Sequence, residues 1–332
     1  MATIAVIGTG TWGIALTNHL SKLGHKVKCW SAIKEEIEIL STKYVHPNLP
    51  DMIISNEVYF TTNIEDAIVN SDVVLFAVPS KFIRSTAKLA NPYINNKQIV
   101  VTVSKGLEDE SFMTMTDIIE EELGNDFTGN TVVLSGPTHA EEVALGLPTT
   151  IVCASMNEAN RVLVRDIFDS EDFAVFLSDD IKGVEYCGAF KNIIALAVGI
   201  SRGIGYGDNA KAAIMTLGLN DIHRIGVAMN CKEETFMGLA GLGDLIVTCT
   251  SEHSRNNRCG FYIGQGMKAD EAVNKVGMVV EGLSALPAAV HIANKLNIHT
   301  DVIEAVYKIV NENADPRIIT RKLLWFCDKG NA

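Results

Sequence analysis

Residues 3–13 read TIAVIGTGTWG, an apolar strand pattern that runs into a glycine-rich turn at the start of a helical pattern. Gly8 allows a tight turn, Gly10 lets the backbone approach a pyrophosphate, and Gly13 lets helix and strand pack closely. The N-terminus of the helix offers N–H groups and a positive dipole end to phosphates. A glycine turn is common by itself. Placed between a strand and a helix, with a second strand expected at Lys26–Trp30, it predicts a dinucleotide-binding fold.

Short β-type runs alternate with helical patterns through the first half of the chain. We expect strands at Thr3–Gly8, Lys26–Trp30, Asp72–Val78, Ile99–Ser104, Val132–Ser135 and Thr149–Ala154. Helices are expected between them at Gly13–Leu23, Ile33–Ser41, Lys81–Ala90 and Phe112–Leu123. This alternation predicts an α/β fold, a Rossmann-type, doubly wound parallel sheet with helices on both faces.

The strand signal disappears after about residue 180, and helical patterns take its place. Helices are expected at Ile181–Ile200, Ala210–Met229, Ala269–Val276, Gly282–Leu296 and Asp301–Val310. The sequence therefore predicts a dinucleotide-binding domain over residues 1–180 and an all-helical substrate and catalytic domain over residues 181–332.

The totals exclude several classes of protein. A net charge of -12 argues against nucleic acid and anionic membranes as partners. The apolar run Ile193–Ile200 is far shorter than the ~20 residues that span a bilayer. No basic stretch precedes the strand at Thr3, so we expect a cytoplasmic protein without a signal peptide. The seven cysteines, Cys327 among them, and the eight histidines are scattered, which predicts reduced thiols and no metal site.

Lys191 is the only charged residue between Tyr186 and Ile200. Small and aliphatic residues share its helix face, namely Val184, Gly188, Ala195 and Val198. Burial disfavours the ammonium form and lowers the pKa of a lysine, which suits proton exchange near neutral pH. The alternative is a structural lysine that reaches solvent past its short neighbours.

Four further segments are polar or glycine-rich: Ser104–Glu108, Ser135–Glu142, Gly205–Lys211, and Gly241–Leu245 with the following His253–Arg258. The first two follow expected strands, where open α/β sheets bind ligands. Asp208 or Asn209 is a candidate helix cap. Taken singly, each segment is more typical of a turn with a cap than of a site.

Together with the glycine turn, the Lys191 helix and Val279-Val280-Glu281-Gly282, these segments resemble the bacterial NAD(P)-dependent sn-glycerol-3-phosphate dehydrogenase family. The resemblance extends from Ile4 to about Val310. It implies reversible hydride transfer between NAD(P)H and dihydroxyacetone phosphate, giving sn-glycerol 3-phosphate for phospholipid synthesis. The oligomeric state, including a homodimer, stays open.

The resemblance also implies roles for individual residues. It assigns proton transfer to Lys191. It places substrate contacts at Lys105, Gly136, Thr138, Lys191, Asp244, Ser254, Arg255 and Asn256. Beside the turn glycines Gly8, Gly10 and Gly13, it places cofactor contacts at Thr11, Trp12, Lys105, Ala140, Arg255, Val279 and Glu281.

The choice between NAD and NADP is open in the sequence. An acidic residue at the end of the second strand selects NAD, and an arginine there accommodates the 2′-phosphate of NADP. Here the strand is followed by Ser31, Ala32, Ile33 and Lys34, where the family often carries a basic pair. Ser31 could bond either sugar and Lys34 could reach a phosphate, so we expect a dual or weak preference.

Two alternatives remain at this point. One is another two-domain dehydrogenase with a catalytic lysine, of the 3-hydroxyacid or 6-phosphogluconate type, which a panel of substrates would separate. The other is a non-catalytic dinucleotide sensor, although Lys105, Lys191, Asp244 and Arg255 are all present.

Overall fold

The computed structural model describes residues 1–251 and 254–326. It divides into two compact units, which we call the sheet unit (Met1–Lys105 with Met113–Ile181) and the helical unit (Gly106–Phe112 with the residues from Lys182 on). His253, Cys327 and the end of the predicted second domain lie outside the described residues. The short segment 106–112 contributes Leu107 to the core of the helical unit.

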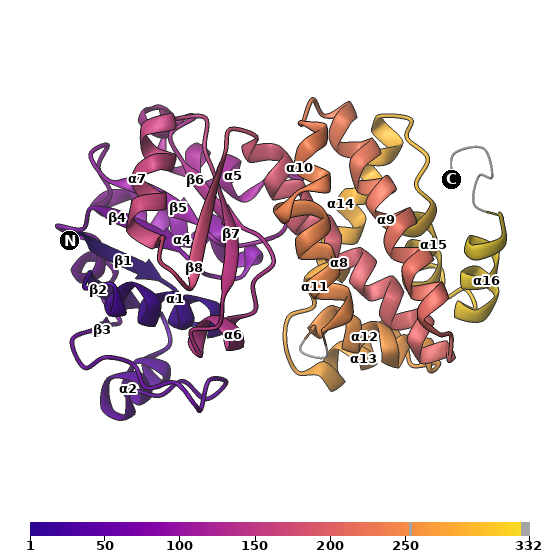
Figure 1. Ribbon diagram of the computed structural model, residues 1–332, viewed down its shortest axis with the longest axis horizontal. Helices are drawn as coiled ribbons and strands as arrows, with labels where there is room; N and C mark the ends of the chain where they lie inside the picture. The colour runs from indigo at the N-terminus through magenta and orange to yellow at the C-terminus, as the bar shows by residue number, and fades with distance from the viewer. Residues whose placement is uncertain (252–253, 327–332) are drawn as a thin grey trace. The chain divides into compact units, whose positions relative to one another are not determined.

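The sheet unit is built on one eight-stranded sheet (Figure 1). Its strands are β1 (Thr3–Ile7), β2 (Lys26–Trp30), β3 (Tyr59–Thr61), β4 (Val73–Phe76), β5 (Ile99–Thr102), β6 (Val132–Ser135), β7 (Thr149–Ala154) and β8 (Phe173–Ser178). They lie in the order β3-β2-β1-β4-β5-β6-β7-β8. The first six strands have the order of the Rossmann fold, so the predicted fold class is confirmed.

Helices cover both faces of the sheet because side chains alternate along each strand. Ile4 and Val6 of β1 lie in one core cluster, whereas Ala5 and Ile7 lie in another. The first cluster includes residues of α1 (Thr11–Lys22), α2 (Lys34–Lys43), α6 (Ala140–Ala144) and α7 (Glu158–Phe168). The second includes residues of α3 (Ile64–Ile68), α4 (Ile83–Ala90) and α5 (Met115–Leu123).

The prediction of a parallel sheet is wrong at one strand pair. β7 pairs antiparallel with β6, through the register Leu134↔Cys153, and β8 then pairs parallel with β7. A buried apolar run looks the same in either direction, so its composition does not report strand polarity. The sequence analysis also missed β3, which has only three residues, and the edge strand β8.

The helical unit contains α8 (Ile181–Ile204), α9 (Asp208–Ala228), α10 (Glu233–Met237), α11 (Asp244–Thr250), α12 (Arg255–Gly264), α13 (Ala269–Val276), α14 (Glu281–Lys295), α15 (Asp301–Asn311) and α16 (Pro316–Phe326). The predicted all-helical second half is confirmed. The candidate cap at Asp208 or Asn209 is wrong, because Gly207 is the N-cap of α9 and Asp208 its first residue.

Helix α8 is the core of the helical unit. Of the described helices, it alone has the length and apolar composition of a membrane span. Its most apolar 18-residue stretch is nevertheless entirely buried in the protein. The apolar character of α8 therefore serves packing within the helical unit.

Candidate active site

The glycine turn between β1 and α1 has two positions that only glycine fits. Gly8 has φ +124°, and a Cβ there would lie 2.6 Å from the carbonyl oxygen of Ala77. A Cβ at Gly13 would collide with the carbonyl oxygen of Gly8. Ala77 follows β4, so the turn packs where the strand order reverses between β1 and β4, the place where such sheets bind ligands.

Gly10, the N-cap of α1, differs from these two glycines. A Cβ added there would meet nothing within 4 Å, and no side chain caps the helix. The N-terminal N–H groups of a helix of 12 residues therefore adjoin open space, which fits the pyrophosphate of a dinucleotide. Thr11 accepts a hydrogen bond from Asn48 Nδ2 at 3.0 Å, and Trp12 is half-buried.

Lys105, Gly136 and Thr138 come together at the carboxyl ends of β5 and β6. Lys105 Nζ and Thr138 Oγ1 each donate to the carbonyl oxygen of Gly136, both at 3.2 Å. Gly136 is packed against β7, where a Cβ would lie 3.2 Å from Cα of Ile151. Ala140, the first residue of α6, is half-buried. Lys105, Gly136 and Thr138 are the substrate residues implied by the resemblance that lie in the sheet unit.

Lys191 is buried in the helical unit, with 6% of its surface exposed. Its Nζ donates to the Oδ1 of Asp244, whose side chain is fully buried, and to Thr248 Oγ1 at 2.7 Å. Thr248 Oγ1 in turn donates to the carbonyl oxygen of Asp244 at 2.7 Å. The alternative of a lysine that reaches solvent past its neighbours is therefore wrong.

The chain brings Asp244 to Lys191 through an unusual turn. Residues Leu239–Gly243 form one π-helical turn that leads directly into α11, and Asp244 is the first residue of α11. A Cβ at Gly241 would collide with the carbonyl oxygen of Phe236, so this turn packs tightly against the end of α10. Single π-turns occur frequently at functional sites.

Helices α8 and α12 approach each other through pairs of glycines. A Cβ at Gly199 would collide with Asn257 O, and a Cβ at Gly260 with Leu196 O. Gly203 and Gly264, four residues further along each helix, are in the same situation with Phe261 O and Ile200 O. Spacing by four places each pair on one helix face, so the two backbones are in direct contact. This contact holds the start of α12 at a defined place along α8.

Asn192, next to Lys191, links α8 to α12 and α14. Asn256 Nδ2 donates to Asn192 Oδ1 at 2.9 Å, and Asn192 Nδ2 donates to Glu281 Oε2 at 3.1 Å. The backbone N–H of Gly282 donates to Asn256 Oδ1 at 2.8 Å. The buried amide of Asn256 thus joins α12, α8 and α14, and the N-terminus of α14 lies beside it.

Arg255 is the first residue of α12. Ser254 caps the helix, since its Oγ accepts the N–H of Asn257 at 3.2 Å. The guanidinium of Arg255 lies 3.9 Å from Glu281 Oε1, and its side chain is 37% exposed. Val279, two residues before α14, is half-buried. Lys211, at the end of the glycine-rich segment Gly205–Lys211, is paired with Asp208 at 2.7 Å.

Sequence reasoning missed two polar residues of this site, Asn192 and Thr248. The signal for Asn192 was present, because an amide beside Lys191 in an apolar helix requires hydrogen-bond partners. Thr248 had no such signal. It lies four residues after Asp244, on the same face of a helix that the sequence analysis did not predict.

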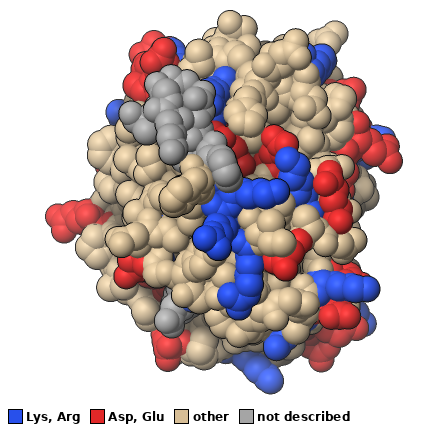
Figure 2. All heavy atoms as spheres, turned by 90° about the vertical axis from the view of Figure 1, so that its right-hand side faces the viewer, with Lys and Arg blue, Asp and Glu red and all other residues tan. Residues whose placement is uncertain are grey.

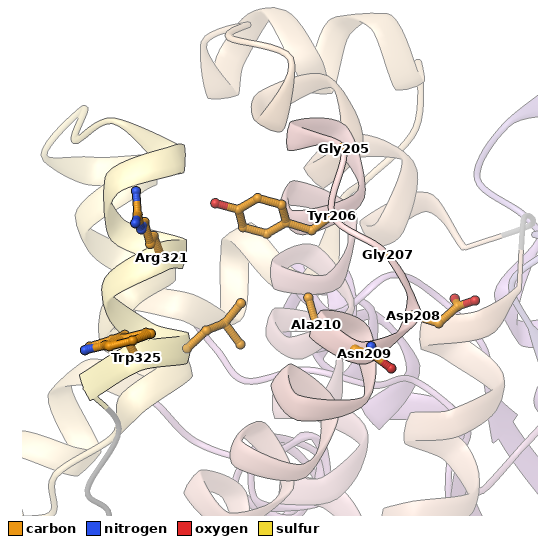
Figure 3. Close-up of a pocket in the computed structure, with 9 residues that line it drawn as sticks. Gly205, Tyr206, Gly207, Asp208, Asn209, Ala210, Arg321 and Trp325 are labelled. Carbon is orange, nitrogen blue, oxygen red and sulfur yellow. The ribbon is translucent and has the colours of Figure 1, made fainter.

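A separate pocket of about 730 Å³ lies between the start of α9 and α16 (Figure 3). Tyr206 points across it toward α16, which contributes Arg321 and Trp325. Lys and Arg side chains gather on the face that carries α16, although the chain is acidic as a whole (Figure 2). Residues 205–210 of the glycine-rich segment line this pocket, whereas Lys191, Asp244 and Arg255 do not.

The cysteines of the described residues contribute no reactive group to the site, and no metal centre is found among those residues. Six cysteines in the described part of the chain are free and buried. Burial raises the pKa of Cys249, close to Lys191 and Asp244, to about 12, so this thiol stays protonated. Over residues 1–251 and 254–326, no group of three or more His, Cys, Asp or Glu side chains could hold a metal ion.

The sequence matches two family descriptions that together span most of the chain. The description "NAD-dependent glycerol-3-phosphate dehydrogenase N-terminus" matches residues 3–161. The corresponding description of the C-terminus matches residues 180–321.

Individual relatives are similar over nearly their whole length. The glycerol-3-phosphate dehydrogenase (NAD(P)+) 2 of Lactobacillus delbrueckii subsp. bulgaricus is 49% identical over 320 residues, which cover 96% of this chain and 95% of that protein. A glycerol-3-phosphate dehydrogenase (NAD(P)+) of Fusobacterium nucleatum is 46% identical over 325 residues, covering 98% and 97%. The crystal structure of the glycerol-3-phosphate dehydrogenase of Coxiella burnetii has a TM-score of 0.92 at 33% identity, and covers 97% of this chain and 98% of that chain.

Proposed function

This chain belongs to the NAD(P)-dependent glycerol-3-phosphate dehydrogenase family, and we propose that Lys191 exchanges the proton of the reaction. The protein is an NAD(P)-dependent oxidoreductase that interconverts dihydroxyacetone phosphate and glycerol 3-phosphate, a precursor of phospholipids. Family membership decides against the hydroxyacid dehydrogenase and the non-catalytic sensor. The observation that carries the proposal is an ammonium group buried against Asp244 and Thr248.

Reduction of a ketone needs a hydride at carbon and a proton at oxygen. When bound, the nicotinamide cofactor supplies the hydride. Lys191 Nζ donates the proton to the oxygen that was the carbonyl of dihydroxyacetone phosphate, and in the oxidation direction it takes the proton back. Lys105 is proposed as a contact of both substrate and cofactor, with a positive charge that stabilises negative charge developing in the reaction.

Asp244 and Thr248 orient the ammonium group. Because the Thr248 hydroxyl donates to the carbonyl oxygen of Asp244, it accepts from Lys191. An ammonium group has three N–H donors, and two directed hydrogen bonds set its rotation about the Cε–Nζ bond. The Asp244 carboxylate also stabilises the charged form that burial would otherwise disfavour, so the proton donor is maintained in an apolar helix.

The start of α12 is our proposed phosphate site. The Arg255 guanidinium can donate two hydrogen bonds to phosphate oxygens, and the N–H groups of the ten-residue helix behind Ser254 add a positive dipole end. Asn256 holds the N-terminus of α12 in position, because its side-chain amide is hydrogen-bonded to Asn192 and to the N–H of Gly282. Gly136 and Thr138 are proposed to line the substrate pocket.

The dinucleotide is NAD or NADP, as in the relatives. The glycine turn with Thr11 and Trp12 is proposed to bind its pyrophosphate, and Ala140, Lys105, Arg255, Val279 and Glu281 are proposed as further cofactor contacts. The sheet unit is thus proposed as the cofactor domain and the helical unit as the substrate and catalytic domain. We further infer that the enzyme works in the cytoplasm, which the free thiols of the described residues support. Sedimentation velocity would test whether it forms a homodimer, the assembly that the sequence leaves open.

The assay that tests the proposed function is oxidation of NADH and NADPH on addition of dihydroxyacetone phosphate. Arg255→Ala should raise the KM for dihydroxyacetone phosphate about 100-fold, because a charge-assisted contact to phosphate is lost. With the wild-type enzyme and a truncated substrate that lacks the phosphate, added inorganic phosphate should restore part of the activity. With Arg255→Ala this rescue should be weaker. Arg258→Ala, an exposed arginine on the same helix, is the control and should change KM little. An unchanged KM in Arg255→Ala would contradict the proposal that the start of α12 binds the phosphate.

A further inference from the structure

The carboxylate of Glu36 lies at the carboxyl ends of β1 and β2. Glu36 is in the first turn of α2, five residues after Ser31. Its Oε2 accepts a hydrogen bond from Ser31 Oγ at 2.9 Å and another from Thr9 Oγ1. Ser31 and Thr9 are buried, with 6% and 3% of their surfaces exposed. Two buried hydroxyls therefore hold this carboxylate in place.

The two hydroxyls belong to the dinucleotide turn and its neighbouring strand. Thr9 lies between Gly8 and Gly10, and Ser31 directly follows β2, whose Trp30 pairs with Ile7 of β1. The N–H of Gly8 donates to the carbonyl oxygen of Trp30 at 2.9 Å, which ties the turn to the end of β2. Folds that bind NAD place at this strand end the acidic group that binds the ribose hydroxyls.

We propose that Glu36 binds the adenosine ribose hydroxyls of NAD(H) and thereby makes this enzyme prefer NAD(H) to NADP(H). The inference rests on the proposed binding of a dinucleotide by the glycine turn. An ionised carboxylate only accepts hydrogen bonds, and ribose hydroxyls can donate them. A 2′-phosphate carries negative charge into the same place, where a fixed carboxylate repels it.

Two groups close to Glu36 in space or in sequence, His46 and Lys34, give little positive charge to a 2′-phosphate. His46 is buried close to Glu36. Burial lowers the pKa of His46, and this effect is larger than the opposite effect of the negative charge of Glu36, which raises it. Its ring is therefore neutral at the pH of the cell. Lys34 is exposed at the start of α2, where solvent screens its charge. The expectation of a dual or weak preference rests on residues 30–34 and stays a prediction. The carboxylate of Glu36 lies just beyond these residues in the sequence and beside Ser31 in the structure.

The test is equilibrium binding, measured by calorimetry without substrate, of NADH, NADPH and their nicotinamide-free fragments ADP-ribose and 2′-phospho-ADP-ribose. The wild-type protein should bind NADH and ADP-ribose more tightly than the phosphorylated partners. Glu36→Gln keeps the shape and an acceptor for Thr9 and Ser31. It should shift the ratio of the two dissociation constants by about tenfold toward NADPH, because the repulsion is gone. Glu35→Gln removes the same charge from an exposed neighbour and should shift the ratio less than about twofold.

The outcomes separate this inference from the function on which it rests. A ratio that Glu36→Gln leaves unchanged, or an equal loss of affinity for all four compounds, assigns Glu36 a structural role only and overturns the inference. A wild-type preference for NADPH also overturns it. Failure of the wild-type protein to bind either dinucleotide would instead contradict the proposed cofactor site, and the inference would fall with it.

Discussion

Two carboxylates of the helical unit, Asp221 and Asp244, are equally buried and have different surroundings. Both are fully shielded from solvent. Asp221 on α9 accepts the backbone N–H groups that begin α15, namely Asp301, Val302 and Ile303, at 2.9, 2.7 and 3.1 Å. It also accepts Arg224 Nη2 at 2.7 Å. Asp244 instead faces the side chains of Lys191 and Thr248.

The two sets of partners distinguish a structural charge from a functional one. The partners of Asp221 are mainly backbone groups at a helix N-terminus, which need a fixed negative charge and exchange no proton. Asp244 instead pairs with a primary ammonium group, which can give up a proton. Burial of a carboxylate is the same signal in both places. The chemistry of the partner decides which cluster can take part in a reaction.

The largest expected effect comes from Lys191→Ala. Turnover should fall by about two to four orders of magnitude, because the proton donor is gone, while the affinity for the dinucleotide stays nearly intact. Steady-state kinetics and equilibrium binding of NADH measure the two quantities. Turnover within a few-fold of the wild type would show that Lys191 is not the proton donor.

The matched control for this variant removes the pair as a whole. Lys191→Ala leaves Asp244 as an uncompensated buried charge, which costs about 3 kcal/mol or more of stability. The double variant Lys191→Met with Asp244→Asn is neutral at both positions and should recover most of this loss. Its turnover should stay as low as that of Lys191→Ala, which separates the loss of chemistry from the loss of stability.

Asp221→Ala should have the opposite signature. Three N–H groups of α15 lose their acceptor, so the free energy of unfolding should fall by about 2–3 kcal/mol. The turnover per folded molecule should remain that of the wild type. Urea unfolding followed by circular dichroism, together with kinetics below the unfolding transition, measures both. A large loss of turnover in the folded variant would end the distinction between the two carboxylates.

The smallest expected effect is an acid sensitivity of the sheet unit. Burial lowers the pKa values of His19, His25 and His46, all in this unit, from 6.5. These rings are neutral in the folded protein, so the unfolded chain binds protons first as the pH falls. Stability is therefore fully present above about pH 6.5 and decreases below it. Trp12 and Trp30 report unfolding of this unit by fluorescence in urea at about pH 8 and about pH 5.5.

A variant of one ring checks the cause. His19→Gln keeps a donor for the carbonyl oxygen of Phe168, which His19 Nε2 contacts at 2.7 Å, and removes one titrating group. The difference in the unfolding midpoint between the two pH values should become smaller. An unchanged difference would assign the acid sensitivity to other groups.

Local chemistry explains which features were predictable. The glycine turn and the alternating strands follow from residues that are adjacent in sequence, where backbone freedom and side-chain alternation act. Strand β3 is too short for a periodic pattern, and the antiparallel direction of β7 leaves no trace in its composition. The glycine pairs of α8 and α12 carried a readable spacing of four, but not the identity of the helix that each one meets.

Local sequence patterns were enough to predict a Rossmann-type sheet followed by a helical half, and an apolar helix that carries Lys191. The partners of that lysine became visible in the folded chain alone, because Asp244 is 53 residues away in sequence and reaches it through a π-helical turn and helix packing. The folded chain likewise shows that Glu36, and not a residue at the strand end, supplies a carboxylate beside the glycine turn. Hydrogen bonds between distant residues depend on how elements pack, and packing is a property of the folded chain as a whole.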